Sequence, residues 1–426
     1  MEELLRIQPP VFPVGNPEMP EAEMFRLDNN VPVFFIEAGT EDVLRIEFTF
    51  HAGMVKEYLP LLASTTNMML KEGSQKYTSE ELNRILDFYG AFLHLSVDRD
   101  RAGIIIFCLS RHLEKILELS LEILFKPVFP EKELNALMRK RLQWFLINRE
   151  KMQNVAIDKF FECIYGKRHP YGHMTVEHDF TGICPPLLND FHGAFYTPEN
   201  MAIIISGKIP SDAGPLINKY LGDLQPAHLK KDENKAILKS LLKKSVHLEK
   251  QGTVQTAIRI GKATINKRHP DYTGLKVVDC ILGGYFGSRL MRNIREDKGY
   301  TYGIRSGVSS LDLSGYMVIS TEVGNEHVQP ALDEIYREIR TLQNEDVPAD
   351  ELEIVRNYMS GEMLRMFDGP FALAETFKSA WEFGLDNSYY LRLADRIRSI
   401  TPGEIKSLAN TYYRIDDLYQ VTAGSK

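Results

Sequence analysis

The chain has 426 residues, with 44% hydrophobic and 26% charged side chains, which is the composition of a soluble globular protein of two or three domains. Its formal net charge of −7 argues against a general nucleic-acid binder, which normally presents a basic face. No apolar run reaches the roughly 18 residues that a transmembrane helix needs. The first ten residues also lack the basic start and apolar stretch of a signal peptide, so we expect a cytoplasmic protein that does not enter a membrane.

Strands and helices are predicted in a regular order along the first half. Residues 31–36 and 44–50 are predicted to be strands, and the second alternates polar and apolar side chains, so one of its faces should be half-buried. Residues 104–109 form an apolar run typical of a buried strand. A helix should follow, because apolar side chains recur at three- and four-residue spacing at Leu113, Ile116, Leu117, Leu121 and Leu124. Pro130 and the acids after it then mark the start of another helix.

The second half repeats this order. Residues 316–321 are predicted to be a strand, residues 328–342 a helix, and Pro348 precedes a further helix. Pro130 and Pro348 are 218 positions apart, and so are Leu134 and Leu352. We therefore predict an N-terminal domain over residues 1–225, a charged linker over 226–245 and a homologous C-terminal domain over 246–426. Strands in short sets followed by helix pairs favour an α+β fold, with mainly antiparallel sheets covered by helices.

The four cysteines, Cys108, Cys163, Cys184 and Cys280, form no C-x-x-C pair, so neither a disulfide framework nor a thiolate zinc site is expected. Cys108 lies in the apolar run 104–109. We interpret it as a small buried hydrophobe and not as a reactive thiol.

The segment from Leu61 to Thr78 reads LLASTTNMMLKEGSQKYT. Its second part, with Met69-Leu70, Gly73-Ser74 and Tyr77-Thr78, resembles the zinc segment of the pitrilysin/insulinase metallopeptidases, and Glu80-Glu81-Leu82 and Tyr89-Gly90-Ala91 continue the match. In that family an apolar helix carries H-x-x-E-H before this tail. Two histidines four positions apart on a helix hold zinc, and the glutamate activates the bound water.

This alignment indicates that the zinc constellation is lost. It places Ser64 and Met68 at the two histidine positions and Asn67 at the glutamate position. An amide is no useful base near neutral pH, and a thioether suits hydrolytic zinc poorly. The family's third ligand, a glutamate on a later helix, falls in residues 139–145, where Gln143 and Trp144 cannot replace it. We therefore expect no metal and no catalytic residues in this chain on its own.

Histidines elsewhere offer no clear substitute. His169 and His173 are four positions apart, but Pro170 and Gly172 between them indicate a turn, and the family has a similar loop with a structural role. A metal site there is the weaker alternative. His192 lies in a segment that matches a packing segment of the family, and we interpret it as a hydrogen-bonded, partly buried histidine.

A second family signature is intact. Residues 282–303 read LGGYFGSRLMRNIREDKGYTYG and resemble the family's glycine-rich loop, a helix that ends in Arg-Glu, a glycine turn and a tyrosine. Gly283 and Gly284 allow a tight bend or a close backbone approach. Arg295 and Tyr302 match the Arg/Tyr pair that helps hold the peptide and its scissile carbonyl in active relatives. From residue types alone, Arg295 could instead pair with Glu296 or Asp297 on a helix surface.

The resemblance implies a processing-peptidase-like fold and the non-catalytic subunit of a heteromeric zinc peptidase. Such a subunit would bind peptide substrates and supply Arg295 and Tyr302 to a homologous partner that alone holds zinc. A structural scaffold, as in the core proteins of the cytochrome bc complex, is the alternative, and a homodimer stays open. An independent hydrolase that uses Ser64 or Thr65 is disfavoured, because no base adjoins either hydroxyl.

Overall fold

The computed structural model describes residues 21–225 and 243–425. The predicted linker over residues 226–245 lies almost entirely outside these ranges, so the domain boundary stays a prediction. No helix in the described ranges is long and apolar enough to cross a membrane.

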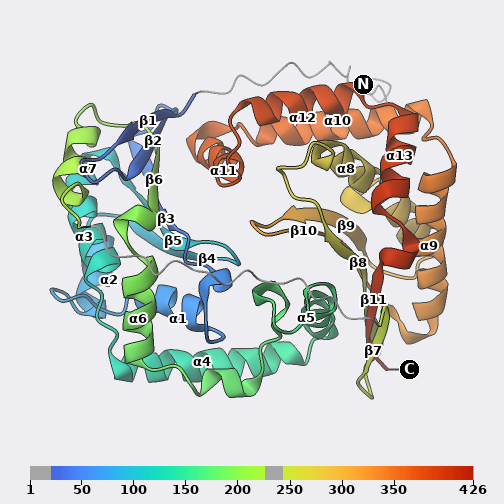
Figure 1. The fold of residues 1–426 in the computed structure, drawn as a ribbon, viewed down its shortest axis with the longest axis horizontal. Coiled ribbons are helices and arrows are strands. Elements are labelled where there is room, and N and C mark those ends of the chain that lie inside the picture. The colour runs from blue at the N-terminus through green and yellow to red at the C-terminus, as the bar shows by residue number, and fades with distance from the viewer. Residues whose placement is uncertain (1–20, 226–242, 426) are drawn as a thin grey trace, which may run out of the picture.

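Two mixed sheets organise the described residues (Figure 1). The first has the order β1-β2-β6-β3-β5-β4, and only β2 and β6 run parallel. Its strands are β1 (Glu23–Arg26), β2 (Pro32–Glu37), β3 (Val43–Phe50), β4 (Phe92–Val97), β5 (Ala102–Leu109) and β6 (Met201–Gly207). The second sheet has the order β7-β11-β8-β10-β9, and only β7 and β11 run parallel. Its strands are β7 (Ser245–Glu249), β8 (Gln255–Thr264), β9 (Ile304–Ser310), β10 (Gly315–Gly324) and β11 (Tyr419–Gly424).

Helices cover both sheets, which confirms the predicted α+β class. The helices before residue 226 are α1 (Leu62–Met69), α2 (Ser79–Phe88), α3 (Leu113–Phe125), α4 (Glu131–Arg149), α5 (Met152–Tyr165), α6 (Pro185–Phe195) and α7 (Ala213–Leu221). Those after residue 242 are α8 (Tyr272–Asp279), α9 (Val328–Asn344), α10 (Ala349–Arg365), α11 (Gly369–Trp381), α12 (Ser388–Ser399) and α13 (Pro402–Tyr412). Two π-helical turns, Cys280–Gly284 and Met291–Asp297, lie between α8 and β9.

The repeat seen in the sequence is a repeat of structure. The order β5-α3-α4 in the first half recurs as β10-α9-α10 in the second. Pro130 and Pro348 each stand directly before the first residue of a long helix, where a missing N–H costs no helical hydrogen bond. Apolar side chains of each sheet and its own helices form a separate core, one around β3 and β5 and one around β8 and β10.

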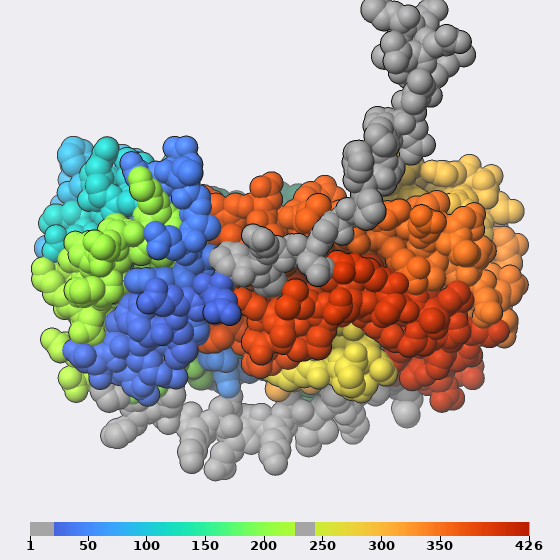
Figure 2. Space-filling model, turned by 90° about the horizontal axis from the view of Figure 1, so that it is seen from above, coloured from blue at the N-terminus to red at the C-terminus, as the bar shows by residue number. Residues whose placement is uncertain are grey.

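Each half also lends a helix to the sheet of the other half. Helix α5 of the first half packs against β8 and β11, where Phe160 and Ile164 share a buried cluster with Tyr419 and Val421. Helix α11 of the second half packs against β6 and β2, with the rings of Phe377 and Trp381 against Phe34. Figure 1 shows this exchange, and Figure 2 shows the blue N-terminal strands directly against the orange surface of the second half.

Burial of β3 differs from the prediction of a half-buried face. Arg45 and Glu47, on the polar face of this strand, are each only 1% exposed, because α11 covers that face. Glu47 accepts hydrogen bonds from Arg45 at 2.8 Å and from Lys378 of α11 at 2.5 Å. Arg45 also pairs with Glu375 of α11. The polar face thus meets charged partners from the other half in place of water.

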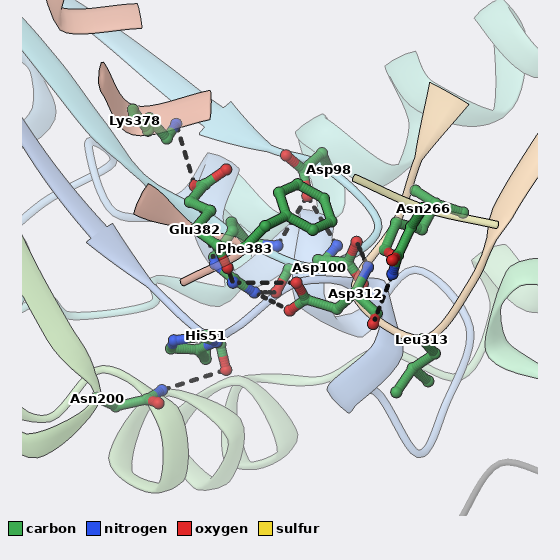
Figure 3. A network of polar contacts seen from close by, with 12 residues as sticks. His51, Asp98, Asp100, Asn200, Asn266, Asp312, Leu313, Lys378, Glu382 and Phe383 are labelled. Carbon is green, nitrogen blue, oxygen red and sulfur yellow. Dashed lines mark hydrogen bonds and ion pairs between the residues drawn. The ribbon is translucent and has the colours of Figure 1, made fainter. Parts of the chain in front are cut away.

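The same buried network continues to the ends of β5 and α11 (Figure 3). Arg101, before β5, pairs with Asp312 in the β9–β10 turn and lies 3.8 Å from Glu382 after α11. Asp100 accepts a hydrogen bond from the backbone of Asp312 at 3.0 Å. Burial raises the pKa of Glu382 to about 7, although Lys378 and Arg101 lower it. Glu382 is therefore protonated in part of the molecules near neutral pH.

Replacing one partner of the buried network should destabilise the protein strongly. Glu47→Gln leaves Arg45 and Lys378 without their shared carboxylate, and we expect it to lower the free energy of unfolding by about 3 kcal/mol in urea titrations. Glu375→Gln is the matched control. Its side chain is 59% exposed, so its loss should cost less than about 1 kcal/mol. Equal effects of the two changes would contradict a network that depends on burial.

The buried Glu382 predicts a pH-dependent difference between the wild type and Glu382→Gln. Because the folded state raises the pKa of this group from 4.5 to about 7, stability falls as the pH rises from about 4.5 to about 7 and stays lower above that. The variant should therefore be more stable than the wild type at pH 8, by on the order of 2–3 kcal/mol. The difference should shrink as the pH falls below 7 and vanish near 4.5. Paired urea titrations at pH 8, 6.5 and 5 measure it, and a constant difference would contradict the assignment.

Candidate functional site

Helix α1 carries the three positions that the sequence aligned with H-x-x-E-H. The residue before it, Leu61, has φ 69°, a left-handed conformation that is strained for a leucine. Its carbonyl oxygen accepts hydrogen bonds from the hydroxyls of Ser64 at 3.1 Å and Thr65 at 2.6 Å. The first turn of α1 is therefore closed by side-chain hydroxyls.

The three motif positions do not form one pocket. Ser64 and Met68, four residues apart, share a helix face. Asn67 points into the core instead, where its amide donates to the carbonyl of Gly103 at 2.9 Å and to Tyr196 at 3.2 Å. Ser64 and Asn67 are buried, and Met68 is half-buried. The position of the family's catalytic base is thus tied to the sheet and the neighbouring helix.

A guanidinium stands beside the degenerate motif. Arg141 of α4 donates to the Ser64 hydroxyl at 2.8 Å and also to the Thr65 hydroxyl. Gln143 and Trp144, which the sequence placed opposite the third zinc ligand, are exposed instead. Sequence reasoning missed Arg141. The one signal for it was a basic residue within the stretch that aligns with the ligand-bearing helix.

The charge balance of this site also involves Glu57. Burial raises the pKa of Glu57 to about 7, although the backbone N–H groups of Ala63 and Leu61 and the charge of Arg141 lower it. Ala63 donates its N–H to this carboxyl at 3.1 Å. Burial lowers the pKa of Arg141 to about 10, so the guanidinium stays charged at neutral pH.

These residues do not fit a zinc ion. Structural and catalytic zinc sites use imidazole, thiolate and carboxylate ligands. Here two neutral hydroxyls and a thioether adjoin a cationic guanidinium, which would repel a divalent cation. Across residues 21–225 and 243–425, no group of three or more histidine, cysteine, aspartate or glutamate side chains could hold a metal ion.

The histidines singled out in the sequence hydrogen-bond or stack with neighbouring residues. His169 accepts a hydrogen bond from the backbone of Tyr171 at 3.1 Å and stacks on Tyr165, whereas His173 pairs with Asp179 at 3.0 Å. His192 lies 2.7 Å from the Leu124 carbonyl oxygen, and burial lowers its pKa. Cys108 is buried, and burial raises its pKa to about 12, so its thiol is not activated.

The second predicted segment lies in the other half of the molecule, where Tyr302 is exposed and Arg295 is half-buried. Arg295 sits in the π-helical turn Met291–Asp297, with its guanidinium 4.6 Å from the ring centre of Phe286. Among the described residues it has no ion pair, so the alternative pairing with Glu296 or Asp297 is not seen. Tyr302, two residues before the edge strand β9, is 93% exposed. No hydrogen bond or ion pair within the described chain joins this segment to Arg141 or α1.

The glycine-rich loop fixes the position of this segment. A Cβ on Gly283 would lie 2.6 Å from the backbone nitrogen of Ser306 in β9, so only glycine permits this approach. Gly284 ends the first π-helical turn and is exposed. Arg289 forms a bidentate ion pair with Glu351 of α10, at 2.8 and 2.7 Å. The loop is thereby held between β9 and α10 while Phe286 stays 63% exposed beside Arg295.

Comparison with known proteins agrees with the family resemblance. Residues 186–359 match the model of the peptidase M16 inactive domain. The chain carries an M16 inactive domain. This confirms the resemblance to the pitrilysin family, and the missing zinc constellation fits a zinc-less member of it.

Individual relatives agree with this assignment. The uncharacterized zinc protease YmxG of Bacillus subtilis is 23% identical over 302 residues, which cover 70% of this chain and 72% of YmxG. The probable inactive metalloprotease YmfF of the same organism is 21% identical over 275 residues, or 62% of this chain and 63% of YmfF.

Solved structures show the same fold. A peptidase M16 inactive domain from Pseudomonas fluorescens superposes with a TM-score of 0.83 at 22% identity, covering 95% of this chain and 98% of that one. A protease from Helicobacter pylori superposes with a TM-score of 0.85 at 16% identity, covering 96% and 100%. The M16 homologue described here therefore has the peptidase-like fold over nearly its whole length.

Arg141 predicts an unusual stability effect. Its charge is largely buried and has no carboxylate within ion-pair distance among the described residues. We expect Arg141→Met, which keeps much of the side-chain volume and removes the charge, to leave the free energy of unfolding unchanged or to raise it by up to about 2 kcal/mol. Ser64 and Thr65 keep their bonds to Leu61 in this variant. A loss above about 1 kcal/mol in urea titrations would show that the guanidinium is a net stabiliser.

Proposed function

We propose that this M16 homologue is the non-catalytic subunit of a heteromeric zinc peptidase. In this proposal it binds the peptide substrate and presents Arg295 and Tyr302 to the active site of a homologous H-x-x-E-H partner. Zinc resides only in that partner. The observation that carries the proposal is a contrast within one chain. The zinc constellation is replaced residue by residue, whereas the Arg/Tyr segment is intact and held in place, with Tyr302 93% exposed.

The unused polar groups of the pair support a role toward another molecule. A guanidinium has five fixed donors for backbone carbonyls, and a tyrosine hydroxyl can donate to a developing oxyanion. Tyr302 makes no hydrogen bond to a described residue. Arg295 makes no hydrogen bond or ion pair to one, although its guanidinium lies over the exposed ring of Phe286. A purely structural arginine would be expected to carry an ion pair, as Arg289 does in the same segment.

Peptide binding is proposed to use sheet edges. Strands β4 and β9 are the outermost strands at one end of their sheets, and each has a single neighbour among the described strands. An extended peptide can add to such an edge through its backbone, which favours unstructured substrates of varied sequence. Strand β4 packs against α1, which carries the degenerate zinc motif. Strand β9 begins two residues after Tyr302, so a peptide on either edge would lie near one of the two candidate segments.

A cytoplasmic location is part of the proposal. All four cysteines are free, and Cys184 is exposed, which suits a reducing compartment. The proposed partner is an H-x-x-E-H homologue made in the same cell.

Peptidase activity of the mixture tests the proposed function. The chain, an H-x-x-E-H homologue from the same genome and their mixture are assayed on unstructured peptides, with and without a zinc chelator. We expect full activity only in the mixture and its loss with chelator. Arg295→Ala or Tyr302→Phe should lower kcat/KM by about 10²–10³-fold, the typical cost of one oxyanion donor.

Two neighbouring residues provide matched controls. Arg292 is an exposed arginine one turn before Arg295. Tyr300, two residues before Tyr302, stacks on His327. Arg292→Ala and Tyr300→Phe should leave the activity of the mixture within about threefold. Activity that chelator abolishes in the pure chain would refute the proposal. Absence of peptidase activity in every mixture would favour the scaffold alternative.

A further inference from the structure

Other buried cations among the described residues have a carboxylate or a backbone carbonyl as acceptor, whereas Arg141 does not. Arg45, Arg101 and Lys378 lie within ion-pair distance of carboxylates, and Arg289 has a bidentate partner. Two more, Arg259 and Lys267, donate to backbone carbonyl oxygens, which carry partial negative charge. Each buried positive charge in this group therefore has an acceptor that offsets part of its desolvation cost.

Arg141 has only neutral partners. Two of its five N–H donors are used by the hydroxyls of Ser64 and Thr65, which leaves three. Glu57 is the nearest acid that affects it, but that carboxyl lies outside ion-pair distance and accepts the N–H of Ala63 instead. The guanidinium is thus a mostly buried charge without an anion at ion-pair distance in the described chain.

The surroundings of Arg141 are open on one side. Met68, on the same face of α1 as Ser64, is half-buried, and Arg141 itself is partly exposed. The adjoining face of α4 bears the exposed cation Lys140, and residues 134–149 contain no acid. The same face presents two large apolar side chains, Trp144 and Ile147, which are 70% and 64% exposed.

We propose that Arg141, standing beside the lost zinc motif, is a receptor for a peptide carboxylate. A carboxylate accepts two parallel N–H bonds from a guanidinium and would supply the direct ion-pair partner that Arg141 lacks among the described residues. The apolar side chains of α4 would contact a neighbouring hydrophobic residue of the same peptide. This inference deepens the proposed function and rests on it for the expectation that peptides reach α1 along β4.

The proposal gives the degenerate site a chemistry opposite to that of the site it replaced. A zinc site polarises the peptide bond and holds a water molecule. A guanidinium beside two hydroxyls binds an anion and cannot generate a nucleophile. The site would therefore select acidic peptides, by an acidic side chain or by the C-terminal carboxylate, while the chemistry takes place elsewhere.

Calorimetric titration of the full chain tests the receptor. The probes are four N-acetylated ten-residue peptides of serine, alanine and leucine, with a central glutamate or glutamine and with a free or amidated C-terminus. We expect at least one carboxylate form to bind tenfold or more tightly than the peptide that has glutamine and an amidated end. Comparison of the two singly charged forms distinguishes a side-chain carboxylate from a terminal one.

Substitutions assign the preference to one residue. In Arg141→Gln the ratio of affinities for charged and neutral peptides should fall below twofold. Lys140→Gln makes an equal change of charge on the exposed face of α4 and should keep at least half of the wild-type ratio. Arg141→Lys keeps the charge without the planar fork and serves if Arg141→Gln fails to fold. It should reduce the preference severalfold.

Three outcomes would overturn the receptor: equal binding of charged and neutral peptides, a preference that survives in both Arg141 variants, or no binding of any probe. The titration uses this chain without a partner, so its result is separate from the mixed peptidase assay. A carboxylate preference with inactive mixtures would refute the proposed function alone. Active mixtures without the preference would refute the receptor alone.

Discussion

The burial of charged side chains between the two halves is the constraint on which the structure depends. Strand β3 lies at the middle of its sheet, and its polar face carries Arg45 and Glu47. Water cannot reach that face, because α11 covers it, so the charges must be matched by Glu375 and Lys378 of α11. A buried ionic network is weak evidence for stability, but it penalises any arrangement that leaves one member unpaired. It therefore selects one docking of α11 on the first sheet.

This fixed docking determines what the degenerate site can become. Helix α1 packs against β4 and β5 of the same sheet, and Asn67 donates a hydrogen bond to the carbonyl of Gly103 at the start of β5. With the base position held in the core, the remaining positions of the motif face α4, where the guanidinium of Arg141 meets Ser64 and Thr65. The position of the lost zinc motif is thus occupied by a polar, cationic site and not by apolar side chains. The Arg/Tyr segment depends on different contacts, those of Gly283 with β9 and Arg289 with α10.

Much of this arrangement could be predicted from the sequence, and the part that could not has a common cause. Local patterns correctly indicated β5, α3, the proline-led starts of α4 and α10 and the repeat that relates them. The match to a family tail located Ser64, Asn67 and Met68 on one helix. Periodicity does not reveal what covers an element, however. Alternating residues 44–50 have the same pattern whether their polar face meets water or an ion network, and nothing local shows that α5 and α11 pack on the opposite sheet. Arg141 was missed for the same reason, since its role arises only where two helices meet.

The exchange of helices has a consequence for synthesis on the ribosome. Arg45 emerges early, but Lys378, its neighbour across the network, is added more than 300 residues later. At a translation rate of about 5–20 residues per second, the charged face of β3 waits for on the order of tens of seconds before α11 can cover it. Helix α5 waits likewise for β8 and β11. During this interval the nascent N-terminal half has one sheet face uncovered and one helix without its sheet. Chaperones that hold emerging chains would meet the protein in this state, and the final closure of both halves would be a single late event.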